Sequence, residues 1–485
     1  MEHFFDWFGR QSHLDRPWLI LGKGPTFAAR SQFDLTKFHL LSLNHAVREQ
    51  SVALAHMIDL DVVDACGEAL VEHAGHVVLP WLPHVRNAVG TRPLAQVVPG
   101  HPVLRRLAAE GRLLWYDLST APKRYGPGPV VRATHFSAEA AVSLLALAGV
   151  RRVRSLGVDG GVVYSSEFDD LADRTLLANG HPAFDLQFQG IARTIQATGV
   201  DFAPLDQPSP ILACIIGNEA MELADRVLEF SLRKHTSMSL AVTSLELIPR
   251  AASAQSSPYR AVVLRSGSLA FDDLRKLWGR PRGGDTVEIA RREASGDSRP
   301  PNLAVVTAAD QHRLRAAAVA ALGLSPAVQV ADPGSESASL PARVPVLPPG
   351  WDRDDVWDRQ TSFLCYADPV YQPWVSLSHP VGHLWVATLI EAIDSGSIPL
   401  ELVRSEVHAG RVRPSLLDQI ERGNPEPLLV SWSSRRRDER FTRAQGLAPA
   451  PAARLPDAGA MLRALARQAR RQVSAFRRAR AAAGT

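Results

Sequence analysis

The sequence predicts an α/β protein with two Rossmann-like α/β/α domains, mostly parallel sheets and a basic C-terminal helix. Apolar runs of strand length alternate with helical periodicity over residues 1–206, as is typical of parallel sheets covered by helices. The same alternation restarts after a proline-containing break at residues 206–210. With 46% hydrophobic and 21% charged residues, the 485-residue chain also has the composition of a globular protein.

The first predicted domain, residues 1–206, contains short apolar runs that we interpret as strands. They cover residues 18–22, 38–44, 52–60, 76–81, 113–117, 153–158 and 200–204. Helical periodicity is clearest over residues 137–148 and 185–197. Near-continuous apolar strands are typical of parallel sheets that are buried on both faces.

The second predicted domain spans residues 208–430 and begins with a strand at 211–216, a helix at 219–234 and a strand at 239–245. A segment rich in proline, serine and alanine, residues 332–350, predicts a loop excursion within it.

The remaining residues, 431–485, form an Arg/Ala-rich tail with 13 Arg and 3 acidic residues, a net charge of +10. Since the whole chain carries +4, residues 1–430 carry −6. Apolar residues recur at helical spacing among these arginines, which predicts a basic amphipathic helix. They are Leu462, Leu465, Ala469, Val473 and Phe476. Two interpretations stay open: an anionic partner such as a membrane surface or a phosphorylated glycan, with nucleic acid the least expected, or a helix docked on the acidic body.

Three cysteines cannot form a disulfide framework and fit a reducing compartment. The N-terminal segment is acidic where a signal peptide is basic, and the longest apolar stretch, residues 140–150, is too short to span a bilayer. We therefore expect a cytoplasmic protein, with peripheral attachment to the inner membrane face through the tail as one option.

The segment WLILGKGPT, residues 18–26, is an apolar strand that opens into a glycine turn. Gly22 and Gly24 allow the backbone to approach a ligand closely, although the segment matches neither a Walker loop nor a full Rossmann fingerprint. Asn44 ends the next strand, and ligands of open α/β sheets bind at such carboxyl ends. A phosphate-bearing ligand is the functional interpretation, and a glycine turn without ligand is the alternative.

The order of this glycine turn and Asn44 resembles the bacterial CMP-sialic acid sialyltransferases. It equally resembles the related motility-associated, flagellin-modifying glycosyltransferases and pterin diphosphokinase-like domains. The segment FSAEAAVSLLALAGVRRVRSLGVDG, residues 136–160, is similar to the helix–strand–Gly-x-Asp pattern of these families. The resemblance covers residues 15–206.

The resemblance implies metal-free transfer of a sugar from a nucleotide donor. His181 would be the base that activates the acceptor, since an imidazole has a pKa near ~6.5, and Tyr164 would contact the phosphate. The implied nucleotide-binding residues are Gly22, Lys23, Gly24, Pro25, Thr26, Asn44, Ser137 and Asp159. Lys23 stands where these families usually have Asn, and Gly160 and Gly161 stand where an aromatic pair is expected. The alternative for His181 is a loop histidine after an Asn-Gly turn.

Other candidates receive a structural or a ligand-contact interpretation. We interpret His135 as a supporting or capping residue beside the helix at 137–148, with a catalytic base as the less favoured alternative, and the segment 80–84 as structural. His45 and His56 with Asp59 and Asp61 raise the question of a metal site. Because Asp59 and Asp61 alternate along a predicted strand, we favour contacts of these carboxylates with sugar or ribose.

The second domain resembles the glycogenin-like, metal-dependent glycosyltransferases of the GT-A type, in a degenerate form. Arg265-Ser266-Gly267 stands where those enzymes carry Asp-x-Asp, and Cys365 stands where they carry a histidine ligand. A divalent ion between phosphates prefers carboxylate oxygens, so we expect no metal here. The alternative is that Arg265 neutralises phosphate charge itself. A group of aromatic residues could stack on sugars or be buried: Trp351, Trp357, Tyr366, Trp374 and Trp385.

The sequence therefore predicts a glycosyltransferase that moves a sugar from a nucleotide donor, with a CMP-nonulosonate as one candidate, to a glycan or protein acceptor. The nucleotide sugar is a substrate, and no cofactor is expected. The main alternative is a non-catalytic nucleotide- or glycan-binding protein in surface-polysaccharide assembly. Pterin diphosphotransfer rests on fold analogy alone.

Overall fold

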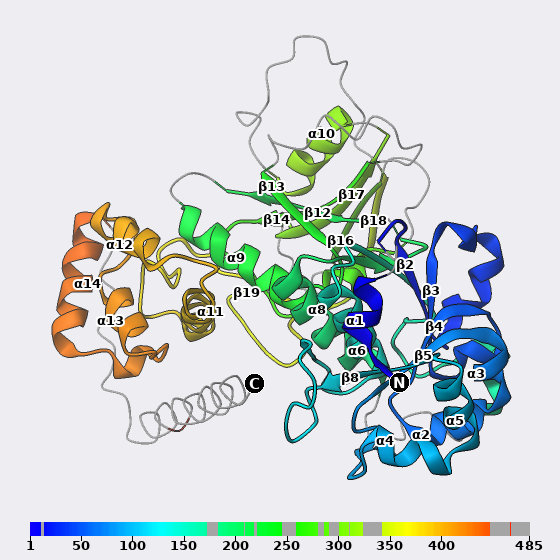
Figure 1. Cartoon of the computed structure of the whole chain (residues 1–485). Coiled ribbons are helices and arrows are strands. Elements are labelled where there is room, and N and C mark those ends of the chain that lie inside the picture. Colours follow the sequence, from blue (N-terminus) through cyan, green and yellow to red (C-terminus); the bar gives the residue numbers. More distant parts are fainter. Residues whose placement is uncertain are drawn as a thin grey trace. The chain divides into compact units, whose positions relative to one another are not determined.

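The structure is a computed structural model that describes residues 1–10, 14–171, 183–207, 209–217, 221–244, 259–279, 286–290, 300–309, 311–323, 342–446 and 466. The chain divides into two compact units (Figure 1). The first contains Met1–Pro210 and Thr236–Ser239, and the second contains Ile211–His235 and the described residues that follow Ser239.

The first unit is built on a nine-stranded sheet in which every strand pair is parallel. This confirms the predicted parallel sheet. The spatial order of the strands is β1 (Glu2–His3), β8 (Leu113–Leu118), β5 (Ala74–Pro80), β4 (Val52–His56), β3 (His39–Leu43), β2 (Trp18–Leu21), β10 (Arg152–Leu156) and β11 (Asp201–Pro204), with β9 (Val130–Val131) beside β8.

Alternate residues of the strands face two separate cores, as expected for side chains on a pleated strand. In β2, Trp18 and Ile20 belong to one core and Leu19 and Leu21 to the other. The first core is completed by α1 (Phe4–Gly9), α6 (Ser137–Leu147) and α8 (Gln187–Thr198). The second is completed by α2 (Leu60–Cys66), α3 (Glu68–His73), α4 (Leu94–Val97) and α5 (Pro102–Ala109). The unit thus has three layers.

One predicted strand of this unit is too long. The strand expected over residues 52–60 ends at His56, because residues from Leu60 onward form helix α2. The apolar residues simply continue from the strand into the helix, so the run of hydrophobicity does not mark the boundary. The strand β1 and the helix α1 at the N-terminus were not predicted.

Two glycine turns bring the carboxyl ends of β2 and β10 into backbone contact. The Gly22 amide donates to the Leu156 carbonyl at 2.8 Å, and the Gly24 amide donates to the Gly157 carbonyl at 2.8 Å. A Cβ at Gly22 would lie 2.2 Å from the Gly157 carbonyl oxygen. Strand packing therefore requires glycine at position 22, whether or not a ligand binds there.

We expect Gly22→Ala to destabilise the first unit by about 1–3 kcal/mol, because an added Cβ forces β2 and β10 apart. Urea unfolding followed by circular dichroism measures the effect. Gly100→Ala is the matched control, since a Cβ there has open space and Gly100 is not at positive φ. Equal stability of the two variants would contradict the packing argument.

The second unit is built on a six-stranded mixed sheet, in which three of the five strand pairs are parallel. The pairs β14–β17 and β16–β17 are antiparallel, and the other pairs are parallel. One of its strands, β18, lies inside the predicted loop excursion at residues 332–350. The order is β13 (Leu240–Ser244), β12 (Ile211–Ile216), β14 (Tyr259–Arg265), β17 (Leu303–Ala308), β16 (Thr286–Ala290) and β18 (Ala342–Leu347).

Helix α10 (Gln311–Ala321) packs on this sheet, and α9 (Glu222–His235) contributes to a second core with a helical cluster. The cluster consists of α11 (Gly382–Asp394), α12 (Leu400–His408), α13 (Ser415–Glu421) and α14 (Trp432–Ala444), next to the small sheet β15 (Ser268–Ala270), β20 (Phe363–Cys365) and β19 (Arg353–Asp354). Most of the aromatic residues proposed for sugar stacking are buried, which contradicts that option for Trp351, Tyr366, Trp374 and Trp385. Trp357 is 41% exposed.

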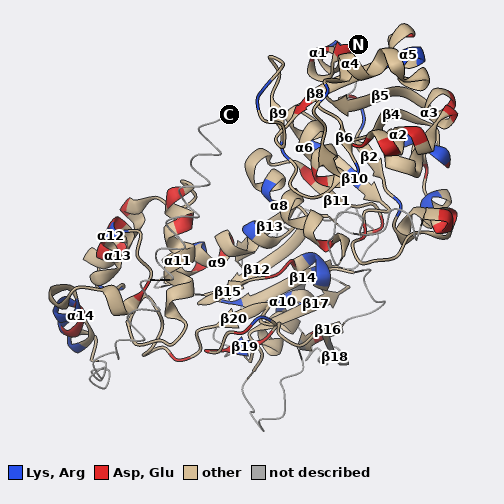
Figure 2. Ribbon diagram, turned by 90° about the horizontal axis from the view of Figure 1, so that it is seen from below, with Lys and Arg blue, Asp and Glu red and all other residues tan. Residues whose placement is uncertain are grey.

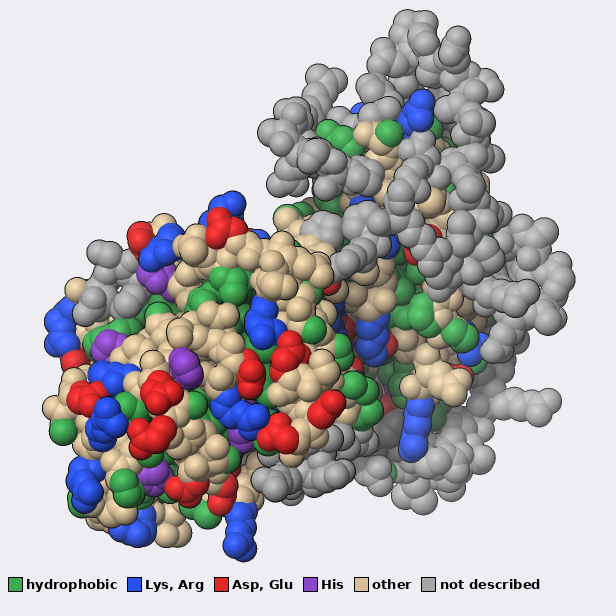
Figure 3. Space-filling view, turned by 90° about the vertical axis from the view of Figure 1, so that its right-hand side faces the viewer, with side chains coloured by type: hydrophobic (Ala, Val, Ile, Leu, Met, Phe, Trp, Pro, Cys, Tyr) green, Lys and Arg blue, Asp and Glu red, His purple; other side chains and the backbone are tan. Residues whose placement is uncertain are grey.

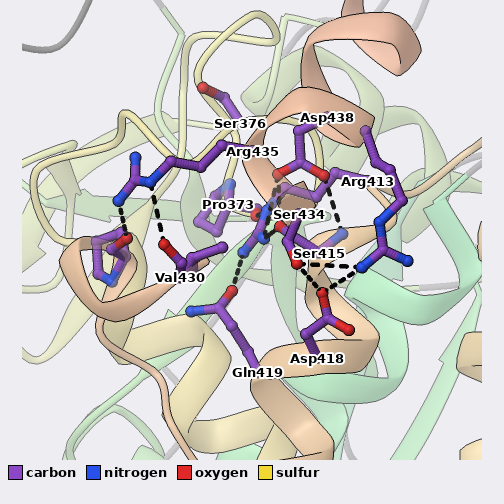
Figure 4. Close-up of polar contacts among 12 residues, drawn as sticks. Pro373, Ser376, Arg413, Ser415, Asp418, Gln419, Val430, Ser434, Arg435 and Asp438 are labelled. Carbon is purple, nitrogen blue, oxygen red and sulfur yellow. Dashed lines mark hydrogen bonds and ion pairs between the residues drawn. The ribbon is translucent and has the colours of Figure 1, made fainter. Parts of the chain in front are cut away.

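A buried polar network joins α14 to α13 (Figure 4). The Arg413 side chain is 1% exposed and donates through Nε to the Pro373 carbonyl at 2.7 Å and through Nη2 to Gln419 at 2.6 Å. Its Nη1 lies 3.9 Å from the Asp438 carboxylate, which also accepts the Ser415 amide at 2.9 Å. Burial lowers the pKa of Arg413 to about 10, and the nearby Asp438 acts in the opposite direction.

We expect Asp438→Asn to lower the free energy of unfolding of the second unit by about 3–5 kcal/mol, because it leaves the Arg413 cation buried beside a neutral group. Differential scanning calorimetry measures the loss. The control is Glu439→Gln, which neutralises the exposed carboxylate of the next residue. A similar loss in both variants would show that the network is not what holds α14.

The segment predicted as a tail thus begins with a packed helix, and Figure 2 shows Lys and Arg gathered on α14. One of them, Arg436, lies 3.6 Å over the ring of Trp432. The predicted amphipathic helix around Leu462 to Phe476 lies outside the described residues, apart from Ala466. Within the described part of the chain, no helix has the length and apolar character needed to cross a membrane.

Candidate functional site

A cavity of about 620 Å³ opens at the carboxyl edge of the first sheet. Its walls come from the segments that follow β2, β3, β4, β5, β8 and β10, and from the N-terminus of α6. A smaller hollow of about 90 Å³ adjoins it. Both are lined by Lys23, Asn44, Phe136, Ser137, Tyr164 and Phe184. Sites of open α/β sheets typically lie at this edge.

Four of the predicted residues converge on this cavity from three loops and a helix terminus. Lys23 follows β2, Asn44 follows β3, Ser137 begins α6, and Tyr164 lies in the loop after β10. The Asn44 amide donates to the Ser137 hydroxyl at 3.3 Å, so residues 93 positions apart in the sequence are in contact. Asn44 has a φ of 52°, which turns the chain away from the strand end.

Lys23 and Tyr164 form one contact pair in the wall. The Lys23 Nζ lies 4.4 Å from the centre of the Tyr164 ring and donates to its hydroxyl at 3.4 Å. The Phe184 ring stacks on Tyr164 at 5.8 Å. Burial lowers the pKa of the Lys23 ammonium to about 8, because the charged form is disfavoured away from water.

The other residues of the predicted glycine turn hold its shape. The Asp159 carboxylate accepts the Thr26 amide at 2.7 Å and the Thr26 hydroxyl at 2.6 Å. The Thr26 hydroxyl also accepts the Gly157 amide at 2.7 Å. Gly22, Gly24 and Asp159 line the smaller hollow, whereas Pro25 and Thr26 line neither space. Thr26 and Asp159 therefore act on the turn itself, and their contact with a nucleotide stays a prediction.

His45, for which the sequence raised only the question of a metal site, is a polar residue that lines the cavity. Its side chain is 1% exposed, and among the described residues neither ring nitrogen has a hydrogen-bond partner. Burial lowers its pKa to about 3, helped by the positive charges of Lys23 and Arg48. The imidazole is therefore neutral. Asn44 Oδ1 is likewise buried without a partner among the described residues.

Glu139 shapes the loop that carries His135. Its carboxylate, in the first turn of α6, accepts the amides of Thr134, His135 and Phe136 at 2.9, 3.1 and 3.1 Å. Burial raises the pKa of this carboxyl group. The capping function that we assigned to His135 thus belongs to Glu139, and His135 lines the cavity instead.

The expectation that Asp59 and Asp61 alternate along one strand is wrong. Asp59 precedes α2 and Asp61 lies in its first turn, because the strand ends at His56. Asp61 accepts the Arg86 amide at 2.5 Å and Asp59 accepts the Asn87 amide at 3.0 Å. The two carboxylates thereby hold the turn of a hairpin, β6 (His84–Val85) and β7 (Ala88–Val89), at the cavity.

The segment 80–84, interpreted as structural, contributes a cavity residue that the sequence did not reveal. His84 lines the cavity, and its Nε2 lies 3.2 Å from the Thr120 hydroxyl. His56, by contrast, is fully buried, and its Nε2 lies 2.8 Å from the Tyr116 hydroxyl. The hairpin brings His84 to the site. Because this position depends on the fold of the hairpin, no periodic pattern in the sequence distinguishes His84 from its neighbours.

The predicted base, His181, lies outside the described residues, and Phe184, three residues later, lines the cavity. In the second unit, Arg265 donates to the Leu322 carbonyl at 2.7 Å, and the Ser266 hydroxyl donates to Asp225. Cys365 is buried opposite Ser268 across the β15–β20 pair, and burial raises its pKa to about 12. Within the described ranges, no group of three His, Cys, Asp or Glu side chains could hold a metal ion.

We expect Glu139→Gln to destabilise the first unit by about 1–3 kcal/mol, because the amide places a donor where the carboxylate accepts the N–H groups of residues 134–136. Hydrogen exchange at residues 134–136 should accelerate along with the loss in urea unfolding. Glu72→Gln, on the exposed face of α3, is the control. Unchanged exchange at these amides would contradict the role of Glu139.

Known proteins offer little to set beside this geometry. No protein-family model matches the sequence, and no curated protein sequence matches it. A crystal structure of the sialyltransferase CST-II in complex with CMP matches part of the chain. That match has a TM-score of 0.25 and 9% sequence identity and covers 39% of this chain and 81% of the other. So low a TM-score does not establish a shared fold.

Proposed function

We propose that the first unit is a nucleotide-sugar transferase, with a CMP-nonulosonate as its candidate donor and a glycan or protein hydroxyl as its acceptor. The second unit acts as a partner domain, since Arg265 and Gly267 stand where a metal-binding Asp-x-Asp would be. The observation that carries the proposal is the convergence of Lys23, Asn44, Ser137 and Tyr164 on one cavity at the carboxyl edge of a parallel sheet.

These residue types suit a phosphate-bearing ligand. The Lys23 ammonium supplies positive charge inside a partly enclosed space, where electrostatic attraction is stronger than in water. The hydroxyls of Ser137 and Tyr164 and the Asn44 amide donate and accept hydrogen bonds, as phosphate, ribose and base require.

Transfer of a sugar leaves negative charge on the departing phosphate. A preorganised ammonium and a phenol hydroxyl can stabilise that charge. Lys23 and Tyr164 are already in contact, so they need little rearrangement to act together on one phosphate group. The acceptor hydroxyl must lose a proton in the same reaction, and His181 is the base that the sequence suggests.

We expect the chain to bind CMP or UDP, and Lys23→Met to weaken that binding by about 10- to 100-fold, as for a lost charge-assisted hydrogen bond. The affinity of the unaltered chain should also fall as the pH rises through about 8, because the free Lys23 side chain then loses its charge. Lys23→Met should abolish this pH dependence. Isothermal titration calorimetry between pH 6.5 and 9.5, with and without magnesium, measures both effects.

Lys37→Met is the control, because the Lys37 side chain is 74% exposed. Absence of binding to every nucleotide would overturn the proposal, and magnesium-dependent UDP binding that survives Lys23→Met would move the site to the second unit. Nucleotide binding without turnover of CMP-N-acetylneuraminate or UDP-glucose would favour the non-catalytic alternative.

A further inference from the structure

The cavity has a second region whose chemistry differs from that around Lys23. Asp59, Asp61, His84 and Thr120 line the large cavity but not the smaller hollow that Lys23, Asn44, Ser137 and Tyr164 share. The cavity carries the Lys23 ammonium where it meets the hollow, which Asp159 also lines, and two carboxylates, the His84 imidazole and the Arg86 guanidinium away from it. A ligand that spans it would be anionic at one end and rich in hydrogen-bond donors at the other.

We propose that this second region binds the hydroxyl-bearing acceptor, and that His84, which lies beside Asp59, takes the proton from the attacking hydroxyl. The inference rests on the proposed transferase function and adds to it the class of acceptor and the identity of the base. The sequence indicated only a structural role for the segment 80–84, which ends at His84.

The backbone fixes His84 beside Asp59. The two residues form a parallel β-bridge, and the His84 amide donates to the Ile58 carbonyl at 2.8 Å. On the side chains, His84 Nε2 lies 3.2 Å from the Thr120 hydroxyl, and the Asp59 carboxylate accepts the Asn87 amide at 3.0 Å. The pair is thus held by contacts on either side of it.

The electrostatics of the pair suit a base that starts neutral. Burial lowers the pKa of His84, while the neighbouring Asp59 acts in the opposite direction. Burial likewise raises the pKa of Asp59, and the proximity of His84 offsets part of that rise. An imidazole that is neutral at rest can accept a proton, and a carboxylate beside it stabilises the imidazolium that results.

The reaction balances with the groups at hand. The acceptor O–H gives its proton to the His84 imidazole, and its oxygen forms a bond to the anomeric carbon of the donor sugar. The bond between that carbon and the phosphate oxygen breaks, and the electron pair stays on the phosphate, which Lys23 and Tyr164 stabilise. The His84 imidazolium then releases the proton to water.

Recognition of the acceptor follows from the two carboxylates. Asp61 and Asp59 each accept one backbone amide of the hairpin, which leaves further lone pairs for hydroxyl donors of a sugar. The residues of the turn, Arg86 and Asn87, also line the cavity, so the hairpin itself would contact the acceptor.

The test compares His84→Gln with His408→Gln, a substitution at an exposed position on α12. Release of CMP or UDP from CMP-N-acetylneuraminate and UDP-glucose is measured with water and with lactose as probe acceptors. We expect His84→Gln to lower turnover by about 10²- to 10⁴-fold, the usual effect of removing a general base. CMP affinity by calorimetry and the thermal midpoint should stay unchanged. Asp59→Asn should lower turnover less.

Retained turnover in His84→Gln with loss in His181→Ala would overturn the assignment and make His181 the base. A chain that binds CMP but turns over neither donor would overturn the transferase function, and this assignment with it. Absence of nucleotide binding by the unaltered chain would overturn the proposed function itself. Turnover by the unaltered chain therefore tests the function, and the comparison of His84→Gln with His181→Ala tests this inference separately.

Discussion

The close contact between the turns after β2 and β10 is the constraint on which the first unit depends. With only hydrogen on the α-carbon of Gly22, the two strand ends approach until their backbones bond directly. Lys23 lies within the first turn and Asp159 follows the second, so the same contact orients the Lys23 ammonium and the carboxylate that stabilises the turn. Any residue larger than glycine would displace both groups at once.

The cavity also brings several ionisable side chains together in a place where burial removes much of the water around them. Burial shifts Lys23, His45 and Asp59 toward their neutral forms, since a charge is costly away from water. Such shifts cluster at functional sites, although structural ion pairs produce them too. Figure 3 shows acidic and basic side chains intermixed over the face of the first unit that it presents, with no extended basic stripe among the described residues there.

Features that follow from local hydrophobicity, such as the strands of the first unit, could be predicted from the sequence. Features that follow from long-range contacts, such as strand direction in the second unit and the position of His84, could not. The parallel strands of the first unit were found because their apolar runs are nearly continuous. In the second unit β17 is equally apolar and buried yet pairs antiparallel, so the pattern could not show the mixed sheet. The predicted residues Lys23, Asn44, Ser137 and Tyr164 meet at the cavity, whereas His84 arrives through a hairpin that two distant carboxylates hold.

Each wall of the cavity comes from a separate connection between a strand and the element that follows it, while the strands themselves are buried in two cores. The turn of the hairpin formed by β6 and β7 is held by two side chains, Asp61 and Asp59, which accept the Arg86 and Asn87 amides. Replacing that short segment with one of another length would change the part of the cavity that the hairpin lines and leave the buried sheet unchanged. Under the proposed function, such an exchange would change the acceptor region and leave the residues around Lys23 in place.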